Sequence, residues 1–283
     1  MTLALEHRPR GPYSLALTAR YASDATRRFS GGRLVALLPE PASAHQLPDG
    51  TVRLQAETEA GLEHLRFVLA LDDDHSELLR RFAGDPLLGE SLRRLRGLRV
   101  LRVPTVAQAL LRALCGQLVT SREARALERR IVRATMPQGQ DGLSEPPTRE
   151  TLGALSPLRL RTLGLAERRA AALVRVCRSL DLERLRSVPT EAAAARLERE
   201  RTLGPWSAGV VCLQGLGRSE RGLVGDLGLV KLLAAQRGRP VEGWETAELL
   251  EPYGEWAGLA SVYLLAGLAA GLVPGVPAPR RAA

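Results

Sequence analysis

The spacing of apolar residues changes along this chain, and that change limits the possible folds more than any other feature of the sequence. Up to about residue 85, apolar side chains alternate with polar or small ones, as in strands with one buried face. The alternating residues are Leu15, Leu17, Val52 and Leu54, and an apolar run with Phe67, Leu69 and Leu71 is interpreted as a further buried strand. Gly31-Gly32 and Pro48-Asp49-Gly50 indicate turns between strands. We expect at least one helix to cover this sheet.

From about residue 86 the spacing becomes helical. Thr105 can cap one helix, and Thr120 with Glu123 forms a capping box for another, after a break at Gly116-Gln117-Leu118. Two apolar stripes at helical spacing consist of Val106, Ala109, Leu110, Ala113 and Leu114, and of Ala170, Leu173, Val174 and Cys177. The sequence predicts an α+β fold: an N-terminal antiparallel β-sheet domain with helices over residues 1–85, then an all-α region over residues 86–283.

The segment from about residue 195 to 215 predicts a helix, a tight turn and a second helix. A helix rich in Ala and Glu ends near Arg199, and Gly204-Pro205 suits the start of the next, because proline is favoured at the first helical position. Such a turn aims free backbone N–H groups outward at a helix N-terminus, where phosphate can bind. The alternative is a plain connection between two helices.

About twenty residues further on, Asp226 precedes another apolar helical run. An aspartate at this position is a good helix N-cap, and capping is by far its more frequent role. A capping carboxylate can also serve in catalysis, so the two interpretations are compatible.

The charge of the chain favours a polyanionic partner. The formal net charge is +9, and all 40 basic residues except Lys231 are arginine, which suits bidentate contacts with phosphate. A GC-rich genome also enriches arginine, alanine and leucine, so the charge supports nucleic-acid binding without establishing it.

Other features of the composition set further expectations. Cys115, Cys177 and Cys212 are expected to be buried thiols in a reducing, cytoplasmic compartment, and the four histidines show no metal-ligand spacing. The apolar segment Leu259–Val273 is short for a membrane span and is interpreted as a buried C-terminal helix. No signal peptide is expected.

Several segments, taken in order, resemble the helix–hairpin–helix DNA glycosylase superfamily, and most closely its bacterial 3-methyladenine DNA glycosylase II family. The resemblance covers nearly the whole chain. It depends on the N-terminal β-rich part, Arg112–Ser121, Leu163-Gly164-Leu165 with the following helix, Leu203–Ala208 and Asp226. Each motif is weakly specific by itself, but the order of the set is distinctive.

The resemblance assigns roles to residues of this chain. Asp226 corresponds to the catalytic aspartate, and Leu118 to an apolar residue that fills the gap left by a flipped base. The residues implied to contact DNA are Gln117, Leu118, Thr202, Gly204 and Ser207. Those implied to line the base pocket are Trp206, Val210, Leu227 and Leu265. Backbone carbonyls of Glu198, Glu200 and Leu203 are implied as a site for a monovalent cation.

The implied activity is that of a monofunctional DNA glycosylase in base excision repair. It would flip alkylated purines such as 3-methyladenine out of duplex DNA and excise them, leaving an abasic site. Because an N-alkylated purine carries positive charge and leaves readily, the main need is a carboxylate that stabilises an oxocarbenium-like sugar and orients water. Bifunctional relatives form a Schiff base through a lysine at the position of Trp206. The resemblance implies a monomer that needs no cofactor, located in the bacterial cytoplasm with the nucleoid.

Two departures from the family leave other functions open. Thr202 stands where the hairpin usually has its first glycine, and the pocket positions Val210, Leu227 and Leu265 lack the aromatic residues common there. The alternatives are a non-catalytic lesion-sensing protein on the same scaffold and a glycosylase for deaminated or oxidised purines. Asp226 favours an enzyme, whereas a neutral base would need a protonating group for which no candidate is apparent.

Overall fold

An antiparallel sheet occupies the N-terminal part of the computed structural model, which describes residues 2–139 and 141–276. In this part of the chain the strands are β1 (Leu3–His7), β2 (Arg27–Ser30), β3 (Arg33–Leu37), β4 (Pro41–Gln46) and β5 (Val52–Ala56), in the order β1-β5-β4-β3-β2. The predicted turns join β2 to β3 and β4 to β5. Gly31 and Gly32 have φ angles of +56° and +75°, the left-handed backbone that a tight hairpin turn requires.

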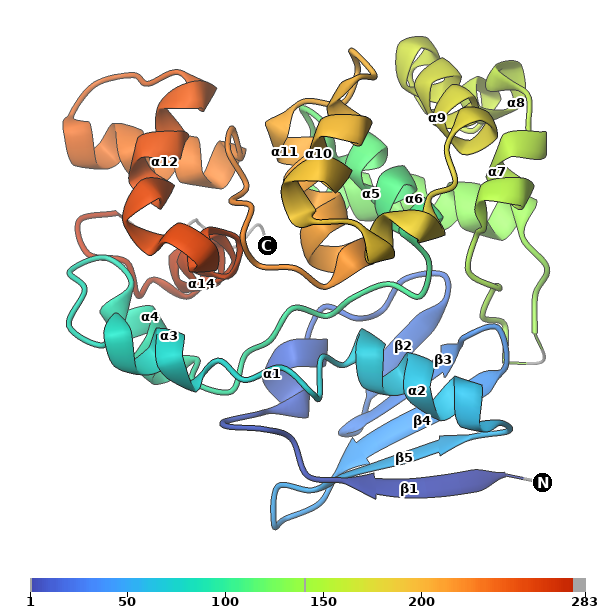
Figure 1. Ribbon diagram of the computed structural model, residues 1–283, viewed down its shortest axis with the longest axis horizontal. Coiled ribbons are helices and arrows are strands. Elements are labelled where there is room, and N and C mark those ends of the chain that lie inside the picture. Colours follow the sequence, from blue (N-terminus) through green and yellow to red (C-terminus); the bar gives the residue numbers. More distant parts are fainter. Residues whose placement is uncertain (1, 140, 277–283) are drawn as a thin grey trace.

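Helix α2 (Glu59–Val68) covers the sheet, as expected (Figure 1). Thr58 caps it by accepting the Gly61 N–H, and Leu62, Leu65 and Val68 face the core. The sequence interpretation of Leu15 and Leu17 as strand residues is wrong, because α1 (Leu15–Ala19) is a helix. Ser14 caps its first turn, and a five-residue segment is too short for its spacing to separate a strand from a helix.

The strand expected around Phe67, Leu69 and Leu71 is also wrong. Phe67 belongs to α2, and the next residues close its C-terminus: the Leu71 N–H donates to the Arg66 carbonyl and the Ala70 N–H to the Phe67 carbonyl. This is the Schellman pattern, with Ala70 in the left-handed conformation (φ +54°) usually taken by glycine. Without a glycine, the helix end has no signal in the sequence.

The regular elements of the rest of the described chain are helices. Its elements are α3 (Ser76–Arg81), α4 (Gly89–Arg94), α5 (Val106–Gly116), α6 (Ser121–Thr135), α7 (Arg149–Ala154), α8 (Pro157–Thr162), α9 (Glu167–Ser179), η1 (Glu183–Ser187), α10 (Thr190–Glu198), α11 (Pro205–Val210), η2 (Val211–Leu216), α12 (Leu227–Arg237), η3 (Gly243–Glu245), α13 (Thr246–Leu250), η4 (Glu251–Trp256) and α14 (Ala257–Ala270). The predicted cap at Thr105 and the capping box of Thr120 with Glu123 are both confirmed, and so are the buried stripes on α5 and α9.

The mixed sheet-and-helix class is thus confirmed, and the buried apolar residues form two cores. One lies between the sheet, α1 and α2, and its last fully buried member in sequence is Leu71. The other is helical and already includes Leu78 of α3, although the sequence placed the start of the helical region at about residue 86. Helix α3 has only six residues, too few for an apolar period to be recognised.

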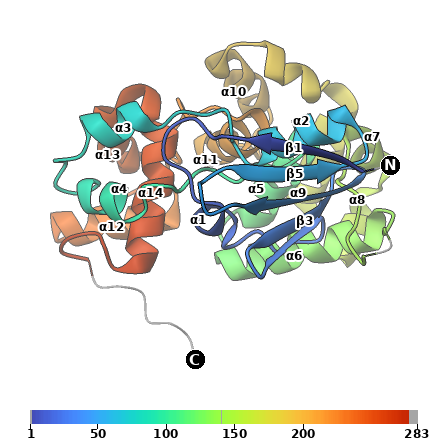
Figure 2. The same ribbon diagram turned by 90° about the horizontal axis from the view of Figure 1, so that it is seen from below.

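The helices form two groups beside the sheet. In Figure 1, α3, α4, α12 and α14 lie on the left, α5 to α9 on the right, and the hairpin helices α10 and α11 between them. Figure 2, seen from below the sheet, shows the same division, with α6 running past the β2–β3 side. The expected buried C-terminal helix is α14, and Cys115, Cys177 and Cys212 are buried thiols. Within residues 2–139 and 141–276, no helix combines the length and the apolar character needed to cross a membrane.

Candidate active site

The predicted hairpin consists of α10, a turn over residues 199–204, and α11, with Pro205 in the first helical turn. Gly204 has a φ of −91°, and Thr202 is not among the described residues with left-handed backbone. The turn therefore needs no glycine at position 202. The Thr202 N–H and hydroxyl both point to the Glu200 carboxylate, at 3.4 and 3.3 Å, which leaves the amides of the first turn of α11 as the better phosphate ligands.

Gln117 connects the hairpin to the loop between α5 and α6. Its Nε2 donates to the Thr202 carbonyl at 2.7 Å and to the Ser207 hydroxyl at 2.9 Å. One amide group thus contacts both the hairpin turn, at Thr202, and the first turn of α11, at Ser207. The position of the next residue, Leu118, is fixed relative to the hairpin by these two bonds.

Leu118 combines two properties that are unfavourable for a leucine. Its φ angle is +54°, a left-handed conformation that costs a side chain with a Cβ about 1–2 kcal/mol. It is also 83% exposed, more than any other large apolar residue of the described chain. Strained backbone persists where the surrounding structure holds it and is concentrated at functional positions. An apolar side chain held out into solvent can enter an apolar partner without further rearrangement.

Asp226 is the N-cap of α12, as predicted, and both of its carboxylate oxygens are engaged. Oδ1 accepts the Gly228 N–H at 2.8 Å, and Oδ2 accepts the indole N–H of Trp206 at 2.9 Å. Gly225, just before it, has a φ of +86° and donates its N–H to the buried Thr246 hydroxyl at 2.7 Å. Two donors from different helices hold the plane of the half-buried carboxylate in one orientation.

Trp206 joins three elements at this point. Its side chain starts in the first turn of α11, donates to Asp226 at the start of α12, and lies against Gly116 at the end of α5. A Cβ at Gly116 would come within 2.7 Å of the tryptophan ring, so a glycine is needed there. The requirement at Gly116 was missed in the sequence, because it depends on a contact between residues ninety positions apart.

The four predicted pocket residues do not all meet at Asp226. Leu265 of α14 lies against Gly228, where an added Cβ would clash with its Cδ2, so it borders the first turn of α12. Trp206 contacts Asp226 directly, and Leu227 is 48% exposed beside it. Val210 is buried and belongs to the helical core. The structure thus brings Trp206, Leu265 and Asp226 together and assigns Val210 to packing.

Trp244 is an exposed aromatic residue near Asp226 that was missed in the sequence. It lies in η3 and is 66% exposed. The neighbouring Gly243 packs on Gly225, since a Cβ at Gly243 would be 3.4 Å from the Gly225 Cα. The sequence offers one signal for this residue, a tryptophan next to a glycine in an otherwise polar segment.

Of the three residues whose carbonyls are expected to bind a monovalent cation, Glu198 ends α10, and Glu200 and Leu203 lie in the hairpin turn. The Glu200 carbonyl accepts the Leu203 N–H at 2.8 Å, which leaves its second lone pair for another partner. Carbonyl oxygens are suitable ligands for a hard cation. The residues are therefore compatible with such a site, which stays a prediction.

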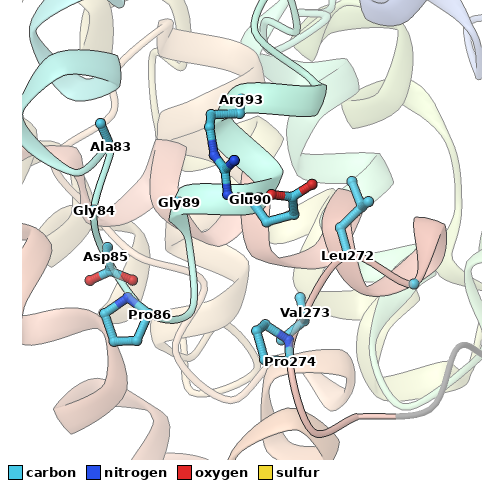
Figure 3. A pocket seen from close by; sticks show the side chains of 11 residues that line it. Ala83, Gly84, Asp85, Pro86, Gly89, Glu90, Arg93, Leu272, Val273 and Pro274 are labelled. Carbon is cyan, nitrogen blue, oxygen red and sulfur yellow. Dashed lines mark ion pairs between the residues drawn. The ribbon is translucent and has the colours of Figure 1, made fainter.

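A hollow of about 430 Å³ lies apart from these residues, between the loop before α4 and the end of α14 (Figure 3). Its lining comes from residues 83–93 and 271–274, neither of which includes a predicted site residue. Asp85 at its edge accepts the Leu87 and Leu88 N–H groups and the Tyr253 hydroxyl. These bonds give Asp85 a structural role.

Comparisons with known proteins identify the fold. No family model matches the chain. The DNA-3-methyladenine glycosylase of Bacillus subtilis (strain 168) is 27% identical over 206 residues, which are 69% of this chain and 67% of that protein. A 3-methyladenine DNA glycosylase structure from Archaeoglobus fulgidus is similar with a TM-score of 0.81 at 20% identity, over 93% of this chain and 97% of that one. The Clostridium acetobutylicum 8-oxoguanine glycosylase/lyase, in complex with duplex DNA, gives 0.79 at 16% identity, over 96% and 99%. The resemblance inferred from the sequence is thereby confirmed at the level of the fold.

Proposed function

We propose that this chain, which has the fold of the helix–hairpin–helix DNA glycosylases, is itself a DNA glycosylase that removes damaged bases from duplex DNA. Its proposed substrates are alkylated purines such as 3-methyladenine, and its product is an abasic site for base excision repair. The observation that carries the proposal is the carboxylate of Asp226, held at the start of α12 by the Gly228 amide and the Trp206 indole beside the hairpin.

The chemistry needs a carboxylate of this kind. As the glycosidic bond breaks, positive charge develops on the sugar, and an oriented anion opposite C1′ stabilises that charge. A cationic alkylated purine is already a good leaving group, so no strong general acid is required. Because each Asp226 oxygen accepts one N–H, its remaining lone pairs can orient a water toward C1′.

Extrusion of the base is assigned to the loop between α5 and α6. Removing a base from the stack costs a few kcal/mol. Leu118, exposed and held in its strained conformation, would offset part of that cost by entering the gap. Amides of the first turn of α11, near Gly204 and Ser207, would hold a phosphate of the same strand.

Hydrolysis without strand cleavage is the proposed course of the reaction. A lyase needs an amine at C1′, but Trp206 has no nucleophilic nitrogen, and its N–H is engaged by Asp226. Lys231 is exposed on α12, five residues after Asp226, which is about 7.5 Å of helical rise. We therefore assign attack on the sugar to water.

The test is release of bases from methylated genomic DNA, identified by mass spectrometry, with wild-type protein and with Asp226→Asn. Asparagine keeps an oxygen for the N-cap bond, but its amide nitrogen is a donor and cannot accept the Trp206 N–H. The variant should therefore fold and bind DNA while losing the charge, the Trp206 bond and base release. Wild-type release of 3-methyladenine by the variant would leave Asp226 as a helix cap only. Release of oxidised or deaminated purines alone would redirect the substrate assignment, and binding without any release would favour a lesion sensor.

A further inference from the structure

Tyr21 is an exposed aromatic side chain between two arginines, far in sequence from the candidate active site. It follows α1 and is 62% exposed. The guanidinium carbons of Arg20 and Arg125 lie 4.9 and 5.7 Å from the centre of its ring. Nearby Arg112 pairs with two carboxylates, whereas neither Arg20 nor Arg125 forms an ion pair within the described chain. Both cations are therefore available to an anionic partner.

We propose that Tyr21, Arg20 and Arg125 form a second DNA-binding surface, which holds the backbone of the duplex on the side of Leu118 that lies away from the hairpin. This inference rests on the proposed function. It assigns a role in DNA binding to the N-terminal sheet domain, which lies outside the hairpin and Asp226 motifs.

The surface is continuous with the loop that carries Leu118. That loop leads directly into α6, and Arg125 is four residues into the helix after Ser121, about 6 Å along its axis. Gln117, on the other side of Leu118, is hydrogen-bonded to the hairpin. The order hairpin, Leu118, Arg125 and Tyr21 therefore follows one path over the molecule.

The segment that carries Tyr21 is fastened to the two helices on either side of Leu118. The Ser23 carbonyl accepts from Arg129 of α6 at 3.0 Å, and the Asp24 carboxylate accepts from Arg112 of α5 at 2.8 Å. Arg112 also pairs with the buried Glu128 of α6 at 2.8 Å. Tyr21 thus keeps a fixed position relative to Leu118, as a contact to the same duplex requires.

Duplex DNA is the partner that the chemistry of this surface favours. Two guanidinium groups match phosphates, and the exposed phenol adds a hydroxyl donor and a ring that packs on a sugar. A protein partner would be expected to cover a larger apolar area than one tyrosine offers. The net charge of +9 also favours a polyanionic partner such as DNA.

The test compares Tyr21→Ala and Arg125→Gln with Arg8→Gln. Arg8 is an exposed arginine next to β1, at the sheet edge opposite β2, so its replacement changes the charge equally at a remote place. Affinity is measured on undamaged duplex and on duplex with an abasic-site analogue, over a range of salt concentrations. We expect a three- to tenfold loss for the first two variants and less than twofold for Arg8→Gln. The slope of log Kd against log salt should fall by about 0.9 in Arg125→Gln.

Duplexes truncated on one side of the lesion locate the contact. The loss of affinity in Tyr21→Ala should disappear when the duplex is shortened on one side of the lesion and persist when it is shortened on the other side. At saturating protein, single-turnover base release should equal that of the wild type. Each of three results would overturn the inference: unchanged affinity in the variants, an equal loss of affinity on both truncated duplexes, or slower base release at saturating protein. Because undamaged duplex is included, the surface is tested even if the wild type releases no base, which would overturn the proposed function alone.

Discussion

Truncation of Leu118 should separate function from stability. Full burial of a leucine side chain contributes about 1.5–3 kcal/mol, and at 83% exposure only about a sixth of this, roughly 0.3–0.5 kcal/mol, is lost in Leu118→Ala. Leu114, one turn earlier on α5, is fully buried, so Leu114→Ala should cost about 2–5 kcal/mol. In Leu118→Gly, relief of about 1–2 kcal/mol of left-handed strain should make the variant at least as stable as Leu118→Ala.

The two measurements are urea unfolding and affinity for a duplex with an abasic-site analogue. Affinity should fall about tenfold in Leu118→Ala, equivalent to about 1.4 kcal/mol, because the gap in the stack is no longer filled. A loss of more than about 2 kcal/mol in the free energy of unfolding would show that the side chain is buried in solution. Wild-type affinity for the abasic duplex would refute its role in the gap.

Three further predictions concern the buried charges and the active site. Burial raises the pKa of Asp24, but Arg27 and Arg112 outweigh this effect and hold the pKa below its ordinary 3.8. The ionised Asp24 carboxylate therefore stabilises the folded protein fully above its unfolded-state pKa, and this stabilisation is lost as pH falls through its folded-state pKa. Asp24→Asn should therefore lower the free energy of unfolding, measured in urea at pH 7, by about 3–5 kcal/mol. The variant should also lose less stability than the wild type below about pH 4, and an equally steep loss in both would contradict this. Gly116→Ala should displace the Trp206 ring and slow base release, measured in single turnover against Ala variants of exposed residues. Borohydride should trap no protein–DNA adduct, and an adduct that disappears in Lys231→Ala would overturn the monofunctional assignment.

Local signals predicted several long helices that begin at a capping residue, but they failed at the short helix α1, despite its Ser14 cap, and at the end of α2. Thr105, Thr120 with Glu123, and Asp226 each have a side chain that accepts a backbone N–H a few residues on, so the sequence alone locates these helix starts. The end of α2 is closed by backbone bonds around Ala70, with no glycine to mark it. There the apolar run through Leu71 was mistaken for a strand.

Only part of the candidate site was predictable as a set of residues, since Trp244 was missed and Val210 belongs to the core, and the geometry of the site was not predictable. The hairpin and Asp226 were both located from residue type and order. The bond between Trp206 and Asp226 joins residues twenty positions apart, and the contact of Trp206 with Gly116 depends on how α5 packs against α11. Neither follows from a local pattern, because each is decided by tertiary packing. The exposure of Leu118 likewise depends on the left-handed turn between α5 and α6.

A lysine and a tryptophan at position 206 would affect the structure around Asp226 differently. A lysine would place a nucleophile beside the sugar, but it could not fill the space against Gly116 that the indole occupies. The indole couples the end of α5, and through Gln117 and Leu118 the proposed base-extruding loop, to the carboxylate that would face the sugar. Because one rigid ring contacts both, the position of the loop and that of the Asp226 carboxylate are linked. This coupling favours a site in which base extrusion and positioning of the carboxylate occur together.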